Sequence, residues 1–278
     1  MNSAYLLEEL RANVGETDAE KHWTDAELLR KLSFSHKKAG FMVSASDGDR
    51  LQKSTDLIPS SSIVTLPSDF SKFNYMEEKV SGREIPLVNT VRERRVNRSY
   101  ATGLDLGTLS CYFSGDTIEI NHDDYSTVVT LWYEPKIINL HAGIGFTGST
   151  TNTIVFEVAN DPSFVDDYYN DTSFTIIAGT GLGTTVAVSD YVGATYTATL
   201  AGTFSTSSVY GSISPLPEEC AEFIVLDATV SAMAKPSAAL DPKYFEYFRS
   251  RLADARRLLD GWLAVRSRGN KHIRYSGS

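Results

Sequence analysis

The chain carries no lysine or arginine between Lys136 and Lys235, and this gap contains a segment of distinct character. Residues 139–215 are rich in threonine, serine and glycine, and apolar residues alternate there, as in 153–158 and 195–200. Such alternation places every second side chain on one face of a strand. The spacing of these runs predicts a small all-β domain, an Ig-like sandwich.

Helical patterns surround this segment. Thr24-Asp-Ala-Glu27 forms a capping box, which predicts a helix that starts there and reaches about Ser44. Residues 217–235 are apolar or small nearly all round, as in a core helix, and Asp241-Pro242 is an N-cap followed by a first-turn proline. The helix after it is predicted to bury a stripe of apolar residues and to expose Arg251 to solvent. The stripe consists of Phe245, Phe248, Leu252, Leu259 and Trp262.

Short strands are predicted between the first helices and the β segment. Ser114-Gly-Asp116 lies between two alternating runs and predicts a hairpin. Because helices resume at Pro217, we interpret 139–215 as an insertion and expect it to fold on its own. The predicted fold class is therefore α+β: a helical-bundle host with a small β element, residues 1–138 and 216–278, plus the inserted domain at 139–215.

Composition excludes several classes of protein. A net charge of −9 argues against a protein that coats nucleic acid. The chain contains no run of eighteen apolar residues, so no membrane span is predicted. Acids near the N-terminus argue against a signal peptide. Cys111 and Cys220 have neither disulfide nor metal spacing. The segment after Lys235 has the opposite sign of net charge from the whole chain, because its nine bases and four acids give +5.

Motifs for chemistry are weak. Gly143-Ile-Gly-Phe-Thr-Gly148 has the dinucleotide-binding spacing, but a strand-like run follows it where a helix is needed. The histidines are scattered, and no hydrolase or metal motif is present, so we expect no enzyme and no cofactor. Oxygen ligands for calcium occur without EF-hand order at Asp161, Asp166, Asp167 and Asp171, and an ion there stays open.

Several segments, in order, resemble the head–tail adaptor (connector, or head-completion) proteins of tailed bacteriophages. They are the helix pair with Trp23-Thr-Asp-Ala-Glu-Leu-Leu29, the strand end Leu66-Pro-Ser-Asp-Phe70, the hairpin Tyr112-Phe-Ser-Gly-Asp-Thr-Ile-Glu-Ile120, the strand Val128-Thr-Leu-Trp-Tyr133, and Leu216-Pro-Glu-Glu opening a helix pair with a basic end. The likeness covers about residues 4–136 and 216–275. The insertion departs from the simplest members.

The resemblance implies a structural virion protein, made in the host cytoplasm and located in the neck. Copies would form a ring, usually of twelve, between the portal and a tail or tail-nozzle protein, with viral DNA passing through without sequence recognition and no membrane involved. The C-terminal segment would dock on the portal through Arg266, Arg268, Lys271, His272, Ile273, Arg274 and Tyr275. The arginines that could face DNA are Arg92, Arg94, Arg95 and Arg98, although a solvated helix face is the commoner reason for such a group.

Two other functions remain open on the sequence. One is a virion-associated peptidoglycan hydrolase. The other is a glycan-binding module in which the β insertion presents Tyr168, Tyr169, Tyr191 or Tyr196. Aromatic side chains on a sandwich more often belong to its core.

Overall fold

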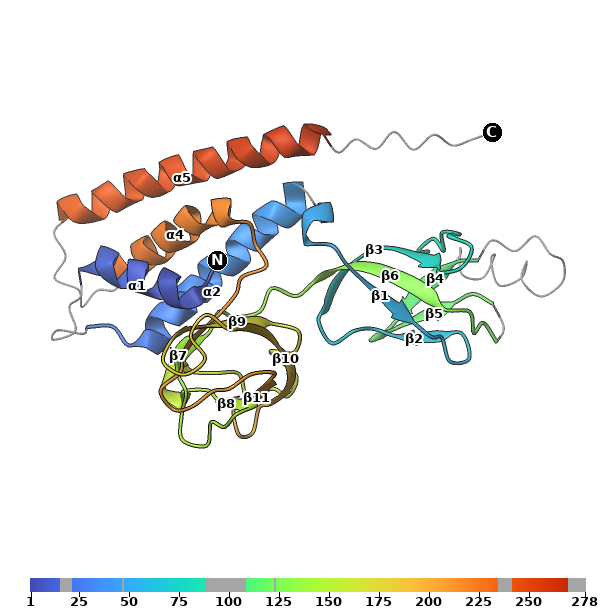
Figure 1. The fold of residues 1–278 in the computed structure, drawn as a ribbon. Coiled ribbons are helices and arrows are strands. Elements are labelled where there is room, and N and C mark those ends of the chain that lie inside the picture. Colours follow the sequence, from blue (N-terminus) through green and yellow to red (C-terminus); the bar gives the residue numbers. More distant parts are fainter. Residues whose placement is uncertain (16–21, 47, 89–108, 123, 235–241, 270–278) are drawn as a thin grey trace. The chain divides into compact units, whose positions relative to one another are not determined.

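The computed structural model describes residues 1–15, 22–46, 48–88, 109–122, 124–234 and 242–269. The chain divides into two compact units. One combines Met1–Asp47 with Ile137–Ser278 and is called the half-barrel unit here. The other is Gly48–Lys136, the small β unit. Figure 1 labels the elements of both.

The helices of the half-barrel unit are α1 (Ser3–Val14), α2 (Asp25–Ser46), α4 (Ala221–Met233) and α5 (Pro242–Gly269). The capping box at α2 is confirmed: the Glu27 amide donates to Thr24 Oγ1 at 3.2 Å, and the Thr24 amide donates to Glu27 Oε2 at 3.1 Å. A short 3₁₀ helix, Glu218–Cys220, leads into α4. Since α4 buries residues on nearly every side, α1, α2 and α5 can all pack against it.

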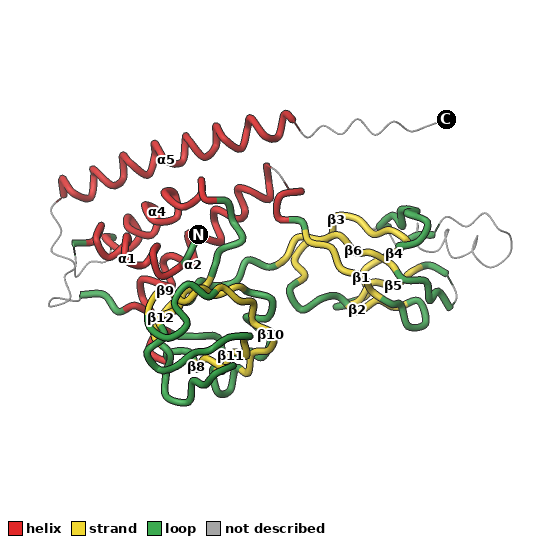
Figure 2. The backbone as a smooth tube through the Cα atoms, in the orientation of Figure 1, coloured by secondary structure: helices red, strands yellow, loops and turns green. Residues whose placement is uncertain are grey.

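The β part of this unit is one six-stranded antiparallel sheet that curls into a half-barrel (Figure 2). Its strands are β7 (Ala142–Ile144), β8 (Thr153–Val155), β9 (Ser173–Ala178), β10 (Thr185–Val192), β11 (Thr197–Leu200) and β12 (Val209–Ser212), in the order β7-β12-β9-β10-β11-β8. The side chains inside it are mostly aromatic: Phe156, Tyr169, Phe174, Tyr191 and Tyr210. Some neighbouring rings lie tilted or edge to face, and Phe156 stacks with Tyr191 and with Tyr210.

Side chains satisfy the backbone groups at the β7 edge of the half-barrel. The short helix η2 (Val158–Asn160) follows β8 and brings Asn160 Nδ2 to within 2.8 Å of the Ala142 carbonyl oxygen. Glu157 Oε2 accepts a hydrogen bond from the Ile144 amide at 3.3 Å. A Cβ added at Gly143 would lie 2.9 Å from Asn160 Nδ2, so this close approach requires glycine. An edge that would otherwise be open is thereby covered.

Buried polar contacts join the half-barrel to the helices. Ser3 Oγ donates to the His141 carbonyl oxygen at 2.7 Å, and Ser33 Oγ accepts from the Leu140 amide at 3.0 Å. His36 Nε2 lies 2.8 Å from Ser214 Oγ. Apolar packing accompanies them, because Ala4, Leu29 and Ala142 form one buried cluster. This shared core argues against independent folding of residues 139–215.

The small β unit contains two three-stranded antiparallel sheets and opens with the 3₁₀ helix η1 (Gly48–Leu51). The first sheet has the order β1 (Lys53–Leu57), β6 (Val129–Pro135), β3 (Phe70–Glu78). The second has the order β2 (Ile63–Thr65), β5 (Thr117–Ile120), β4 (Cys111–Ser114). The predicted hairpin is confirmed: β4 pairs with β5, and Gly115 in the turn has φ +62°.

Asp69 connects three parts of the small β unit. Its Oδ1 accepts from the Tyr133 hydroxyl on β6 at 2.8 Å, and its Oδ2 accepts from Lys53 Nζ on β1 at 2.9 Å. The Lys136 amide donates to its backbone carbonyl oxygen at 2.6 Å. The turn before β3 is closed by the Phe70 amide, which donates to the Pro67 carbonyl oxygen at 3.0 Å. The segment Leu66-Pro-Ser-Asp-Phe70 therefore joins one strand to the next and also fastens their neighbours.

The predicted fold class, an α+β helical-bundle host carrying an inserted Ig-like sandwich, is wrong. The described residues are mostly β, with three sheets and four α-helices, and no helical-bundle host is evident. Residues 139–215 form one curled sheet, whereas a sandwich needs two stacked sheets. Period-two alternation reports which face of a strand is buried, and both arrangements bury one face. Along the chain, the two units are divided at 47/48 and 136/137. The boundaries of an inserted domain at 138/139 and 215/216 stay a prediction.

The stripe predicted on the last helix can be tested by substitution. Phe248 and Leu259 on α5 are buried, and Phe245, Leu252 and Trp262 are partly buried. We expect Leu259→Ala to lower the free energy of unfolding by about 2–5 kcal/mol, because it removes buried methyl groups and leaves a cavity. Urea denaturation measures this. The control is Arg251→Ala, an exposed position, which should cost under about 0.5 kcal/mol; equal costs would contradict the orientation of α5.

Candidate functional surfaces

An exposed face of α2 carries two large aromatic side chains. Phe34 is 67% exposed and Phe41 is 76% exposed, and their spacing of seven residues places them on one side of the helix. Arg30 and Lys38 lie on the same face. Large exposed apolar side chains on a charged helix face are typical of a surface that another molecule covers.

A buried carboxylate on α4 holds α2 in this orientation. Asp227 Oδ1 accepts from Lys38 Nζ at 2.6 Å, and its Oδ2 accepts from Ser35 Oγ at 2.8 Å. Lys38 also lies over the Phe223 ring, 5.6 Å from its centroid. Because the carboxylate is buried and fully engaged, the rotation of α2 about its axis is fixed, and the exposed face is presented by a rigid helix.

A shallow groove of about 660 Å³ opens beside Phe34. Its walls are the start of α2 and the end of α4, and it is lined by Trp23, Glu27, Arg30, Lys31, Phe34, Ser231 and Ala234. Phe34 and the buried Trp23 supply apolar surface, and Arg30 and Lys31 supply positive charge. Such a groove suits an apolar side chain of a partner that has acidic residues next to it.

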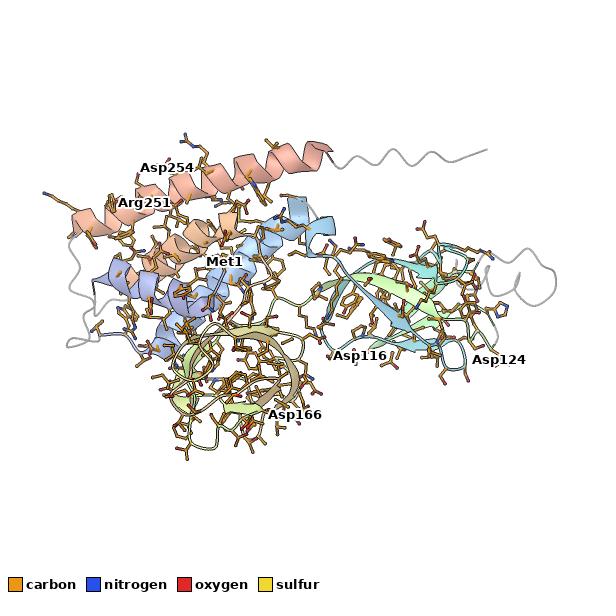
Figure 3. All side chains as sticks on the ribbon, viewed as in Figure 1. Met1, Asp116, Asp124, Asp166, Arg251 and Asp254 are labelled. Atoms are coloured by element: carbon orange, nitrogen blue, oxygen red, sulfur yellow. The ribbon has the colours of Figure 1, made fainter. Side chains whose placement is uncertain are left out.

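A flank of α5 is a second exposed apolar surface. Tyr244, Tyr247, Leu258 and Val265 are all exposed, and the first two rings stack at a centroid distance of 6.4 Å. Arg251, labelled in Figure 3, lies on this flank and donates to Glu222 Oε1 at 2.6 Å. That hydrogen bond raises the pKa of the Arg251 guanidinium. The exposed flank therefore lies beside the buried stripe of α5.

The buried titratable groups have structural surroundings. Burial lowers the pKa of His36 to about 4, against a weaker contribution of the Ile138 backbone, and it lowers the pKa of His141 to about 3. Burial also raises the pKa of the Cys111 thiol to about 12. His141 Nε2 lies 3.1 Å from the Tyr210 hydroxyl, inside the aromatic core. Near neutral pH these groups are therefore uncharged.

The acidic residues considered for calcium have separate roles. Asp161 pairs with Arg30 at 3.0 Å, Asp166 accepts from the Gly193 amide at 2.8 Å, and Asp167 accepts from Asn170 Nδ2 at 2.8 Å. Within the described part of the chain, no group of three or more His, Cys, Asp or Glu residues is placed to hold a metal ion. Asp171 belongs to no such group either.

Two other sequence motifs receive structural explanations. Gly143 lies in β7, and a turn and then β8 follow the glycine pattern, so the helix N-terminus that a dinucleotide needs does not follow it. The tyrosines considered for a glycan platform belong to the half-barrel core: Tyr169 and Tyr191 are buried, and Tyr168 and Tyr196 pack against them.

Most residues predicted to contact the portal or DNA lie outside the described residues. This applies to Arg92, Arg94, Arg95 and Arg98, and to Lys271, His272, Ile273, Arg274 and Tyr275. Arg266 and Arg268 fall in the last turn of α5, which continues to Gly269, beyond the last apolar position predicted for that helix.

The exposed α2 face was missed by sequence reasoning. Phe34 and Phe41 stand in a segment correctly predicted as helix, but only its buried stripe was considered. The available signal was that Phe34 and Phe41 are seven residues apart and lie on a different side of the helix from Leu28, Leu29 and Leu32. An aromatic pair on the opposite side from the buried stripe indicates a second apolar face.

Comparison with known proteins identifies no relative: no protein family and no curated sequence matches this chain. None of the helices in the described residues is both long and apolar enough to cross a membrane.

The two buried histidines predict a pH-dependent stability. Both pKa values are lower in the folded chain than their ordinary value of 6.5, so the unfolded chain binds more protons below that pH. Their contribution is fully present above about pH 6.5 and is lost as the pH falls toward 4. Between pH 7 and pH 5 we expect a loss of about 2 kcal/mol per histidine in the free energy of unfolding.

Urea denaturation at the two pH values measures this loss. His36→Gln and His141→Gln should each remove about half of the difference between the two pH values, whatever they do to stability at pH 7. An unfolding free energy that is the same at both pH values would contradict the assignment.

Proposed function

We propose that this chain is a structural virion protein of a tailed bacteriophage: a head–tail adaptor subunit that forms a ring, a dodecamer by analogy with the adaptor family, between the portal and a tail or tail-nozzle protein, with DNA passing through the centre. The observation that carries the proposal is the exposure of large apolar side chains on two rigid helices, Phe34 and Phe41 on α2 and the flank of α5. Surfaces of this kind favour a subunit that is covered by neighbours.

The order of the sequence motifs along the chain indicates the class of protein that we propose. Leu66-Pro-Ser-Asp-Phe70 and the hairpin ending at Ile120 lie in one compact unit, where Asp69 binds β1 and the end of β6. The family's expected helical-bundle fold is not found, so the proposal rests on these motifs and on the exposed helix faces. An assembly role needs such fixed surfaces and no reaction centre.

The ring is tested by the mass of the particle. Sedimentation of the purified chain, alone and with the portal protein of the same phage, should show a complex that contains many copies of the 30.6 kDa subunit in at least the second sample. A chain that stays monomeric in both samples would contradict the proposal. The alternative of a cell-wall hydrolase predicts a monomer that clears a peptidoglycan suspension.

The docking role of the C-terminal segment is tested by truncation. Deleting all residues after Ser267 removes a basic segment but leaves the packed residues of α5, of which Leu263 is the last buried one up to Val265, where the description of side chains ends. We expect the melting temperature of the isolated chain to stay unchanged and portal binding to be lost, because charge-assisted contacts to the portal disappear. Binding is measured by cosedimentation with portal rings.

A matched control separates the tail from charge in general. The double variant Arg249→Ala, Arg256→Ala removes two exposed cations from α5 and keeps the tail. This variant should bind the portal with nearly the same affinity as the unmodified chain. Portal binding by the truncated chain, or unfolding caused by the truncation, would rule out the docking tail.

A further inference from the structure

A loop of the half-barrel displays an apolar knob, Phe164 and Val165. Phe164 is 79% exposed, and its neighbour is about half exposed. A solvated loop tip would ordinarily carry polar residues in place of this pair. The adjacent residues Asp166 and Asp167 give the knob an acidic border, and Figure 3 labels Asp166 on the half-barrel.

The knob is held rigidly from below. The Tyr191 hydroxyl donates to the Ser163 carbonyl oxygen, and the Gly193 amide donates to Asp166 Oδ1 at 2.8 Å. The Asp167 amide donates to the Tyr191 carbonyl oxygen at 2.9 Å. A Cβ added at Gly193 would lie 2.1 Å from the Phe164 carbonyl oxygen, so the loop rests directly on the end of β10. An anchor fixed in this way loses little conformational entropy when it binds.

The groove beside Phe34 has the complementary properties. It is a hollow with Phe34 and Trp23 as apolar walls, bordered by Glu27, Arg30 and Lys31. Arg30 pairs with Asp161 of its own chain at 3.0 Å, so Lys31 is the cation that the groove presents to a partner. The wider charge distribution agrees. Residues 137–215 hold six acids and no base, a net charge of −6, whereas α2 holds four bases and two acids, a net charge of +2. Because Phe164 is largely exposed, it does not fill the groove of its own chain.

We propose that the Phe164–Val165 knob of one copy inserts into the Phe34 groove of a second copy. Asp166 and Asp167 then approach Lys31, and the two phenylalanine rings meet at the centre of the contact. Knob and groove are different surfaces, so the contact repeats head to tail, as a closed ring requires. This inference rests on the proposed ring and identifies the surfaces by which its subunits meet.

The contact is tested by disulfide cross-linking between copies. Ala234→Cys and Val165→Cys chains, which keep both phenylalanine rings, are distinguished by a tag on one of them, mixed at high concentration and oxidised. The native Cys111 and Cys220 are buried and do not compete. The matched control replaces Val165→Cys by Leu182→Cys, a position on the half-barrel that is 68% exposed. The first mixture should give about tenfold more linked heterodimer, because the contact raises the effective concentration of the two thiols.

A second variant tests the same contact without new thiols. Phe164→Ser keeps the hydrogen bonds under the loop and should raise the concentration needed for assembly by about tenfold, whereas Leu182→Ser should leave it unchanged. Equal cross-linking in both mixtures, or no effect of Phe164→Ser on assembly, overturns the contact. If rings form on the portal without the cross-link, only this inference fails. If the cross-link forms and the portal is not bound, the contact stands and the proposed function fails.

Discussion

The burial of α4 on nearly every side is the constraint on which the half-barrel unit depends. This helix contacts α1, α2 and α5, and its apolar residues form a shared core with α5. Its one buried carboxylate, Asp227, is engaged by Lys38 and Ser35, both on α2. An unpaired charge at this depth would cost several kcal/mol, so the position of α2 relative to α4 is specified sharply. The exposed face of α2, and the groove beside it, follow from that placement.

The half-barrel is attached to this helical layer by polar contacts that water does not reach. Ser3 and Ser33 hold the chain on either side of His141, and His36 contacts Ser214 at the other end of the β segment. Buried hydrogen bonds are costly to leave unmade, so helices and sheet form one folding unit. The knob and the groove therefore belong to one compact body, which suits a subunit that must present two surfaces at once.

The sequence predicted local structure well where the signal was local. The N-terminal capping box of α2, the hairpin at Gly115 and the buried stripe of α5 need only neighbouring residues, and they were found. The curl of the six-stranded sheet was not predicted; the sheet has register shifts at Val188/Asp190 and Val209/Tyr210, and Asn160 and Glu157 bind the backbone of its β7 edge. Such contacts join residues that no periodicity relates.

The sequence by itself determined the helix that follows Thr24, the helices after Pro217, the hairpin at Gly115, where charge gathers, and that residues 139–215 are β. Alternation, capping and turn chemistry act over a few residues, so they can be read from the order of the chain. Only the tertiary structure decided that the β segment curls into one sheet, that it shares a core with α1 and α2, and that Tyr169 and Tyr191 lie inside it. It also decided that Phe34 and Phe164 face outward. Burial is a property of long-range packing, and the same aromatic residue is core or contact surface according to what the rest of the chain leaves uncovered.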